Sequence, residues 1–152
     1  MTLPASIFQI ARSVSTLTLA TTDPKGNPHA APVYFAHDNE LNLYFFSETK
    51  SQHGQDIARN PRAAAAIYPE CEGWQDIRGV QLRGEVLRVE SGETREKAWG
   101  LYKNKFPFVK ALKAIVARNQ MYVLVPNWMR LVDNTQGFGY KQEFRFSDST
   151  NH

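Results

Sequence analysis

The sequence predicts a mainly β protein, a small closed β-barrel of six or seven antiparallel strands with a few helices inserted between them. Runs of β-branched and aromatic residues recur along the whole chain, and clusters of Pro, Gly, Asn and Asp separate them. Apolar residues at helical spacing are confined to a few short stretches. Many short strands with few helices are typical of a barrel.

The first third of the chain predicts a lead helix followed by a three-stranded meander. Residues 4–14 carry apolar side chains at helical spacing, with a proline tolerated in the first turn. Residues 15–22 alternate apolar and hydroxyl side chains, and the next six residues, D-P-K-G-N-P, predict a turn. The second and third strands cover residues 29–37 and 41–47. Pro32 predicts an edge position, a bulge, or a point where a ligand takes the backbone bonds.

The rest of the chain alternates strands and helices. Residues 77–90 give the longest strand pattern, with a bend expected at Gly84. Gly79, Gln81 and Arg83 share one face of this strand, which faces either solvent or else an interface or a ligand. The other predicted elements are a strand at 63–68, a polar loop at 69–76, helices at 91–104 and 109–118, and strands at 121–133 and 137–146.

Size and composition indicate a single globular domain covering residues 1–152. The chain is 42% hydrophobic and 22% charged, which is ordinary for a folded domain. Cys71 is the single cysteine, and the N-terminus lacks the apolar segment of a signal peptide. No apolar run approaches the roughly 20 residues that cross a bilayer. We therefore expect a soluble cytoplasmic protein without a membrane partner.

The charge balance does not favour nucleic acid. Lys and Arg number 18 against 15 Asp and Glu, a net charge of +3. Basic residues between Lys103 and Arg118 are better explained as a solvated helix surface, because a dense arginine cluster and an aromatic sheet platform are both missing. A small anionic ligand remains compatible with this charge.

Most catalytic and metal-binding patterns are missing from the sequence. The four histidines show no metal-ligand spacing, and neither a Walker A nor a G-x-S-x-G sequence occurs. Glu70 and Glu72 flank Cys71 and disfavour its thiolate. We predict no metal site and assign no catalytic residue. Such a protein can still perform redox chemistry when a cofactor carries the reaction.

The polar segment after the third strand, residues 47–50, is the best candidate binding site and is called the knuckle below. Thr49 and Gln52 have capping-box spacing, which predicts that a helix starts there and ends before Pro61. Free N–H groups at a helix N-terminus attract anions, and Lys50 adds a positive charge. The knuckle therefore predicts a phosphate site, although a cap that only stabilises the helix explains the same residues.

Taken together, these segments resemble a known family. The knuckle, the short helix, N-P-R at residues 60–62 and I-R-G-V-Q-L-R-G at residues 77–84 are similar to the FMN-binding split-barrel superfamily of pyridoxamine-phosphate oxidases. With D-N-T-Q-G-F-G-Y-K at residues 133–141, the chain looks most like the YhbP-like branch of that superfamily. The resemblance covers nearly the whole chain.

The resemblance implies a split β-barrel that forms a homodimer with FMN at the subunit interface. By position it assigns the flavin ring to Pro32, Val33 and Tyr34, and the phosphate or ribityl chain to Ser47, Thr49 and Lys50. The oxidases carry a ring-contacting glutamine at the position of Gly79. In this chain the glutamine is Gln81, displaced by two residues on the same strand face.

The C-terminal signature of the oxidases is also missing. The segment that begins at Trp128 has no Arg-x-His sequence to grip the vitamin phosphate, so pyridoxamine-phosphate oxidation itself is not expected. Two hypotheses remain. The first is an FMN-dependent oxidoreductase or flavin carrier of unknown substrate. The second is a non-enzymatic module that binds flavin, haem or deazaflavin in the same cleft, with His29, His37 or His53 as a haem ligand.

Overall fold

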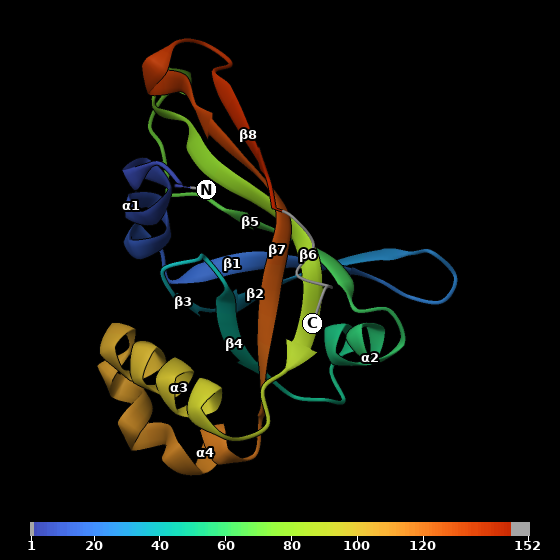
Figure 1. The fold of residues 1–152 in the computed structure, drawn as a ribbon. Helices are drawn as coiled ribbons and strands as arrows, with labels where there is room; N and C mark the ends of the chain where they lie inside the picture. Colours follow the sequence, from blue (N-terminus) through green and yellow to red (C-terminus); the bar gives the residue numbers. More distant parts are fainter. Residues whose placement is uncertain (1, 147–152) are drawn as a thin grey trace.

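The computed structural model describes residues 2–146 as one curled antiparallel sheet with helices around it (Figure 1). The eight strands run in the order β2-β1-β5-β6-β7-β4-β3, and β8 pairs with β7. Their bounds are β1 (Thr16–Thr22), β2 (Pro28–Tyr34), β3 (Ala36–His37), β4 (Leu43–Ser47), β5 (Arg62–Ile67), β6 (Arg78–Arg88), β7 (Gln120–Asp133) and β8 (Lys141–Arg145). This architecture confirms the predicted mainly β split barrel.

Phe35 divides the predicted second strand into β2 and β3. β2 pairs with β1, whereas β3 pairs with β4. β2 and β3 are the first and last strands in the strand order, and only the buried Phe35 separates them in the chain. The two ends of the sheet must therefore lie close together, which curls the sheet round on itself. The last step of the predicted meander is therefore limited to the two residue pairs between β3 and β4, because the main partner of β4 is β7.

The split in the barrel lies between β2 and β4. The ladder between β3 and β4 holds two residue pairs, Ala36 with Tyr44 and His37 with Leu43. Beyond these pairs β2 and β4 lie near each other without pairing, so β2 keeps one unpaired edge. Pro32 lies on this edge strand, which confirms the edge position among its three predicted roles.

The bend predicted at Gly84 is a bulge between the two longest strands. Gly84 pairs with Pro126, while the residue before it pairs with Trp128, so Asn127 is left over on β7. A Cβ atom on Gly84 would lie 2.7 Å from the carbonyl carbon of Val125. Only glycine fits here without a backbone movement, and the bulge turns β6 and β7 together around the core.

The helices lie around the barrel and differ from the predictions mainly at their ends. They are α1 (Ala5–Ser13), α2 (Gln52–Arg59), α3 (Glu93–Lys105) and α4 (Lys113–Ala117), with short 3-10 helices η1 (Trp74–Asp76), η2 (Pro107–Leu112) and η3 (Asn134–Gln136). The helix predicted at 109–118 is thus a 3-10 segment followed by a single α-helical stretch. No helix among residues 2–146 is long and apolar enough to cross a membrane.

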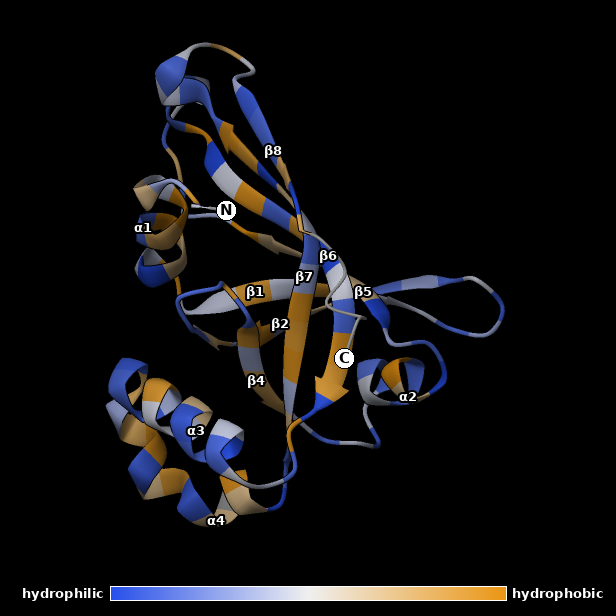
Figure 2. Ribbon diagram, viewed as in Figure 1, coloured by the Kyte–Doolittle hydropathy of each residue, from blue (hydrophilic) through white to orange (hydrophobic). Residues whose placement is uncertain are grey.

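Of three groups of buried apolar residues in the described part of the chain, two contain most of the core. One fills the barrel, where Ile7 and Ile10 of α1 meet inward-facing residues of the strands. The other lies where α3 covers the outside of β4 and β7, through Ala98 against Tyr44 and Met121. Figure 2 shows the central stretch of β7 coloured as strongly hydrophobic and α3 with mixed colouring, as expected for a buried strand and a surface helix.

Candidate functional site

The knuckle is a tight turn that joins β4 to α2. The N-cap of α2 is Ser51, whose hydroxyl accepts from the Gly54 backbone N–H (3.1 Å) and donates to the Glu48 carbonyl (2.7 Å). The predicted cap, Thr49, is therefore wrong by two residues. A Cβ at Gly54 would lie 2.6 Å from the Glu48 carbonyl oxygen, so the glycine lets the first helical turn sit directly on the knuckle.

Three polar side chains meet where β4 ends and α2 begins. The hydroxyl of Ser47 lies 3.3 Å from the hydroxyl of Ser51 and forms a short hydrogen bond with Nε2 of His53. Ser47 is buried, whereas Ser51 and His53 are half-buried. Two hydroxyls and an imidazole therefore lie beside the positive end of α2, where an anion is stabilised.

Burial disfavours the protonated form of His53. Burial lowers the pKa of His53 from its ordinary 6.5, and the negative charge of Asp56 opposes that shift. An anion placed beside the ring favours the protonated form, and imidazolium can then donate a charge-assisted hydrogen bond. The site can thus take up a proton together with an anion.

A buried carboxylate fixes α2 to the barrel. Asp56 is fully buried, and its Oδ2 accepts from the hydroxyl of Thr21 on β1 at 2.7 Å, while its Oδ1 accepts from Nε2 of Gln52 at 2.9 Å. Because both carboxylate oxygens are satisfied, this charge can be tolerated inside the protein. The helix that carries His53 is therefore set rigidly against the sheet.

The structure places the other two predicted knuckle residues in solvent. Thr49 and Lys50 are exposed. Gln55 donates from Nε2 to the Lys50 backbone carbonyl at 2.8 Å, which orders the turn without using the lysine side chain. Lys50 thus contributes charge at the rim, while the contacts at the centre come from Ser47, Ser51 and His53.

The predicted ring-binding segment lies across the split from the knuckle. The β3–β4 pairing of Ala36 with Tyr44, if continued, would set Val33 opposite Ser47. Val33 is buried in the core, so only its backbone faces the split. Pro32 is exposed, and Tyr34 packs its ring edge to face against Phe106 at 5.2 Å between centroids.

Gln81 lies far from the knuckle in the same chain. It pairs with Arg130 of β7, whereas Ser47 pairs with Gln120 of the same strand. Ten residues of β7 separate these points, roughly 30 Å at about 3.3 Å per residue. Gln81 and Pro32 do share the outer face of the sheet, three strand spacings or about 14 Å apart. One FMN cannot reach both Ser47 and Gln81 within one chain.

The sequence interpretation missed Ser51 and named His53 only as a possible haem ligand, not as part of the anion site. Both lie in the sequence S-E-T-K-S-Q-H, in which serine and histidine two residues apart follow a strand end. The capping-box pattern drew attention to Thr49 instead. Among the described residues there is no group of three His, Cys, Asp or Glu side chains suited to a metal ion.

Comparison with known proteins places the chain in a family. The family model described as pyridoxamine 5'-phosphate oxidase matches residues 3–133. The UPF0306 protein plu4501 of Photorhabdus laumondii is 32% identical over 125 residues, covering 82% of this chain and 83% of that protein. The UPF0306 protein YhbP of Escherichia coli O157:H7 is 32% identical over 120 residues, covering 77% and 76%.

Solved structures show the same fold at low sequence identity. The haem storage protein HutZ from Vibrio cholerae superposes with a TM-score of 0.70 at 17% identity, covering 83% of this chain and 91% of that one. A Listeria innocua protein provisionally named a pyridoxamine 5'-phosphate oxidase gives 0.65 at 19% identity, covering 85% and 97%. The chain belongs to the pyridoxamine 5'-phosphate oxidase family, and its relatives there are the UPF0306 proteins that include YhbP.

Proposed function

We propose that this protein binds FMN and is a flavin-dependent oxidoreductase of unknown substrate. The observation that carries the proposal is the group formed by Ser47, Ser51 and His53 at the N-terminus of α2, facing the unpaired edge of β2. Family membership supports the same cofactor. The chain offers few groups for acid–base chemistry, so the reactive atoms are expected to belong to the cofactor.

The described residues fit the two ends of FMN. A phosphate dianion suits two hydroxyl groups, an imidazole that can be protonated, and the N–H groups of Gln52 and His53 in the first turn of the helix. The flavin ring carries polar atoms along its edge, and the free backbone groups of β2 near Pro32 can pair with them. Bound flavin would supply reversible transfer of one or two electrons.

We further propose that the site is completed by a second copy of the chain. Thr49 and Lys50 are exposed and His53 is half-buried, so one chain leaves the knuckle open to solvent. A second copy would enclose the ring and could bring its own Gln81 to it. One FMN would then contact Ser47 of one chain and Gln81 of the other, although these two residues are roughly 30 Å apart within one chain.

The haem alternative has weaker support. The fold is shared with a haem storage protein, but at 17% identity this likeness shows the fold alone. Each of the three described histidines has one ring nitrogen engaged: His29 with Asp23, His37 with the Asp38 carbonyl and His53 with Ser47. The second ring nitrogen of each histidine has no hydrogen-bond partner among the described residues and could bind iron, so the absorption spectrum must separate haem from FMN.

The test is reconstitution with FMN and with riboflavin, which lacks the phosphate. We expect the purified protein to show flavin absorption, and added FMN to raise the melting temperature because it binds only the folded state. Ser47→Ala should weaken FMN binding about tenfold and riboflavin binding much less. The exposed Ser91→Ala variant serves as the control. A colourless protein that excess FMN does not stabilise would refute the proposal, and a haem absorption band in its place would support the alternative.

A further inference from the structure

A second polar region lies on the outer face of the sheet. Paired residues form one row across five strands, in the order Ala20, Ala64, Arg83, Trp128 and Arg145. The two alanines make a low floor, and the last three residues make a wall of two arginines and an indole. Long cationic side chains beside a floor of small residues create a hollow.

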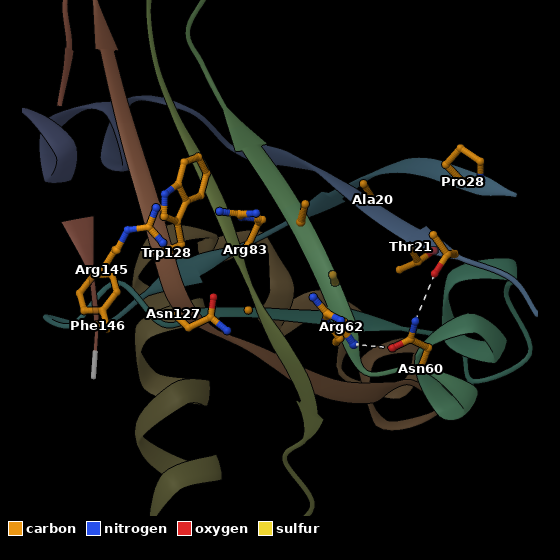
Figure 3. A pocket seen from close by; sticks show the side chains of 14 residues that line it. Ala20, Thr21, Pro28, Asn60, Arg62, Arg83, Asn127, Trp128, Arg145 and Phe146 are labelled. Atoms are coloured by element: carbon orange, nitrogen blue, oxygen red, sulfur yellow. Dashed lines mark hydrogen bonds between the residues drawn. The ribbon is translucent and has the colours of Figure 1, made fainter. Parts of the chain in front are cut away.

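The hollow has a volume of about 730 Å³ and is called the three-arginine pocket here (Figure 3). Among the described residues, its lining includes Arg62, Arg83 and Arg145 and no Asp or Glu. Asn60 shapes one wall, since its Oδ1 accepts from the Arg62 N–H at 3.2 Å and its Nδ2 donates to the Thr22 hydroxyl at 3.3 Å. Each arginine comes from a different strand, so the fold alone brings the three charges together.

One of the three arginines, Arg145, has a carboxylate at salt-bridge distance, and among the described residues the other two do not. Glu143 lies 2.5 Å from Arg130 and 3.9 Å from Arg145, and Arg130 is the first cause of the lowered pKa of Glu143. Glu85 is the cross-strand neighbour of Arg62. Within residues 2–146, neither Arg62 nor Arg83 has a carboxylate oxygen at salt-bridge distance.

An indole at the wall of the pocket carries a buried donor. Trp128 is 8% exposed, and the guanidinium of Arg83 lies 4.2 Å from its ring centroid, with that of Arg130 at 5.0 Å. The indole Nε1 is buried and has no hydrogen-bond partner among the described residues. The indole contributes to the lowered pKa of Glu143, but the geometry between the indole Nε1 and the Glu143 carboxylate is not that of a hydrogen bond.

We propose that the three-arginine pocket binds a small polyanion that carries two or more phosphoryl or carboxylate groups. Arginine forks suit both groups through paired N–H donors, and three of them around one hollow match an anion with several oxygen-rich ends. The pocket is separate from the knuckle, because Ser51 and Asn60 cap opposite ends of α2, about 13 Å apart along its axis. The proposal therefore does not depend on phosphate binding at the knuckle.

Calorimetric titration with inorganic pyrophosphate and with citrate tests this proposal and separates the two chemical sources. We expect saturable binding of at least one probe, one per chain, which weakens as salt rises. Arg62→Gln and Arg145→Gln should each weaken binding about tenfold, while Arg12→Gln, an exposed arginine on α1, should not. The Ser47→Ala variant and FMN-saturated protein should bind the probe as well as the untreated protein does.

Three results would overturn the inference. The first is that neither probe binds, which would be the case if an acidic segment of a second copy filled the pocket. Another is equal weakening by Arg12→Gln and Arg62→Gln, which would reveal general charge attraction instead of a site. The third is loss of probe binding when FMN saturates the protein, which would place the anion at the knuckle. Thermal unfolding by circular dichroism confirms that each variant is folded.

Discussion

Replacing Thr21 with Val tests whether Asp56 anchors α2 to the barrel. The two side chains are nearly equal in size, so packing is kept while the 2.7 Å hydrogen bond from the Thr21 hydroxyl to Asp56 is lost. Thr21 is 2% exposed and Asp56 is fully buried, so water cannot replace the donor. A buried charged acceptor that loses a partner costs about 2–3 kcal/mol in the free energy of unfolding.

Urea unfolding followed by circular dichroism measures this loss. The midpoint should fall while the slope with urea stays constant, because the surface exposed on unfolding is unchanged. For a chain of this size the melting temperature should drop by roughly 5–10 °C. In the Asp56→Asn background the same Thr21→Val change should cost clearly less, since the buried charge is gone. A loss below about 0.5 kcal/mol for Thr21→Val alone would show that Asp56 does not depend on this bond.

Three further predictions concern the knuckle and the bulge. His53→Gln should weaken FMN binding about tenfold. The affinity of the unmodified protein for FMN should rise as pH falls below 6.5, because anion binding raises the pKa of this histidine, and the affinity of the variant should change less. Equal pH profiles of the two proteins in a fluorescence titration would contradict this. The free energy of unfolding should fall as pH drops below 6.5. Burial lowers the folded-state pKa of both His37 and His53, so the unfolded chain binds more protons than the folded chain. Chemical unfolding from pH 7.5 to 5 measures this loss, and the dependence on pH should be weaker in a His37→Asn, His53→Gln double variant. Gly84→Ala should destabilise by about 3 kcal/mol or more, because its Cβ would meet the Val125 backbone, whereas Gly100→Ala, with open space around it, should be harmless in the same urea assay.

Local patterns predicted most of the fold, because each depends on neighbours in the chain. The lead helix, the long strand with its bend at Gly84 and the edge position of Pro32 all follow from spacing or from the chemistry of glycine and proline. The break at Phe35 was not predictable in this way. It depends on β4 pairing with β7, a partner that lies over 70 residues along the chain.

The sequence predicted where the knuckle joins strand and helix, but not which residue caps the helix. Thr49 and Gln52 match a capping box, yet Ser51 is the cap because Gly54 allows the helix to begin against the Glu48 carbonyl. A steric fit of this kind leaves no periodic signal in the sequence. The three-arginine pocket could not be predicted from the sequence for a related reason. Strand register brings Arg83 and Arg145 to either side of Trp128. Register depends on the whole sheet, so no local pattern reveals it.

The affinities of the unmodified protein for FMN and riboflavin test the central claim most directly, because the two flavins differ by the phosphate assigned to Ser47, Ser51 and His53. Two or three charge-assisted hydrogen bonds to a phosphate dianion predict that FMN binds about 100-fold more tightly than riboflavin in a flavin fluorescence titration. Equal affinities for the two flavins, or no binding of either, would contradict the claim.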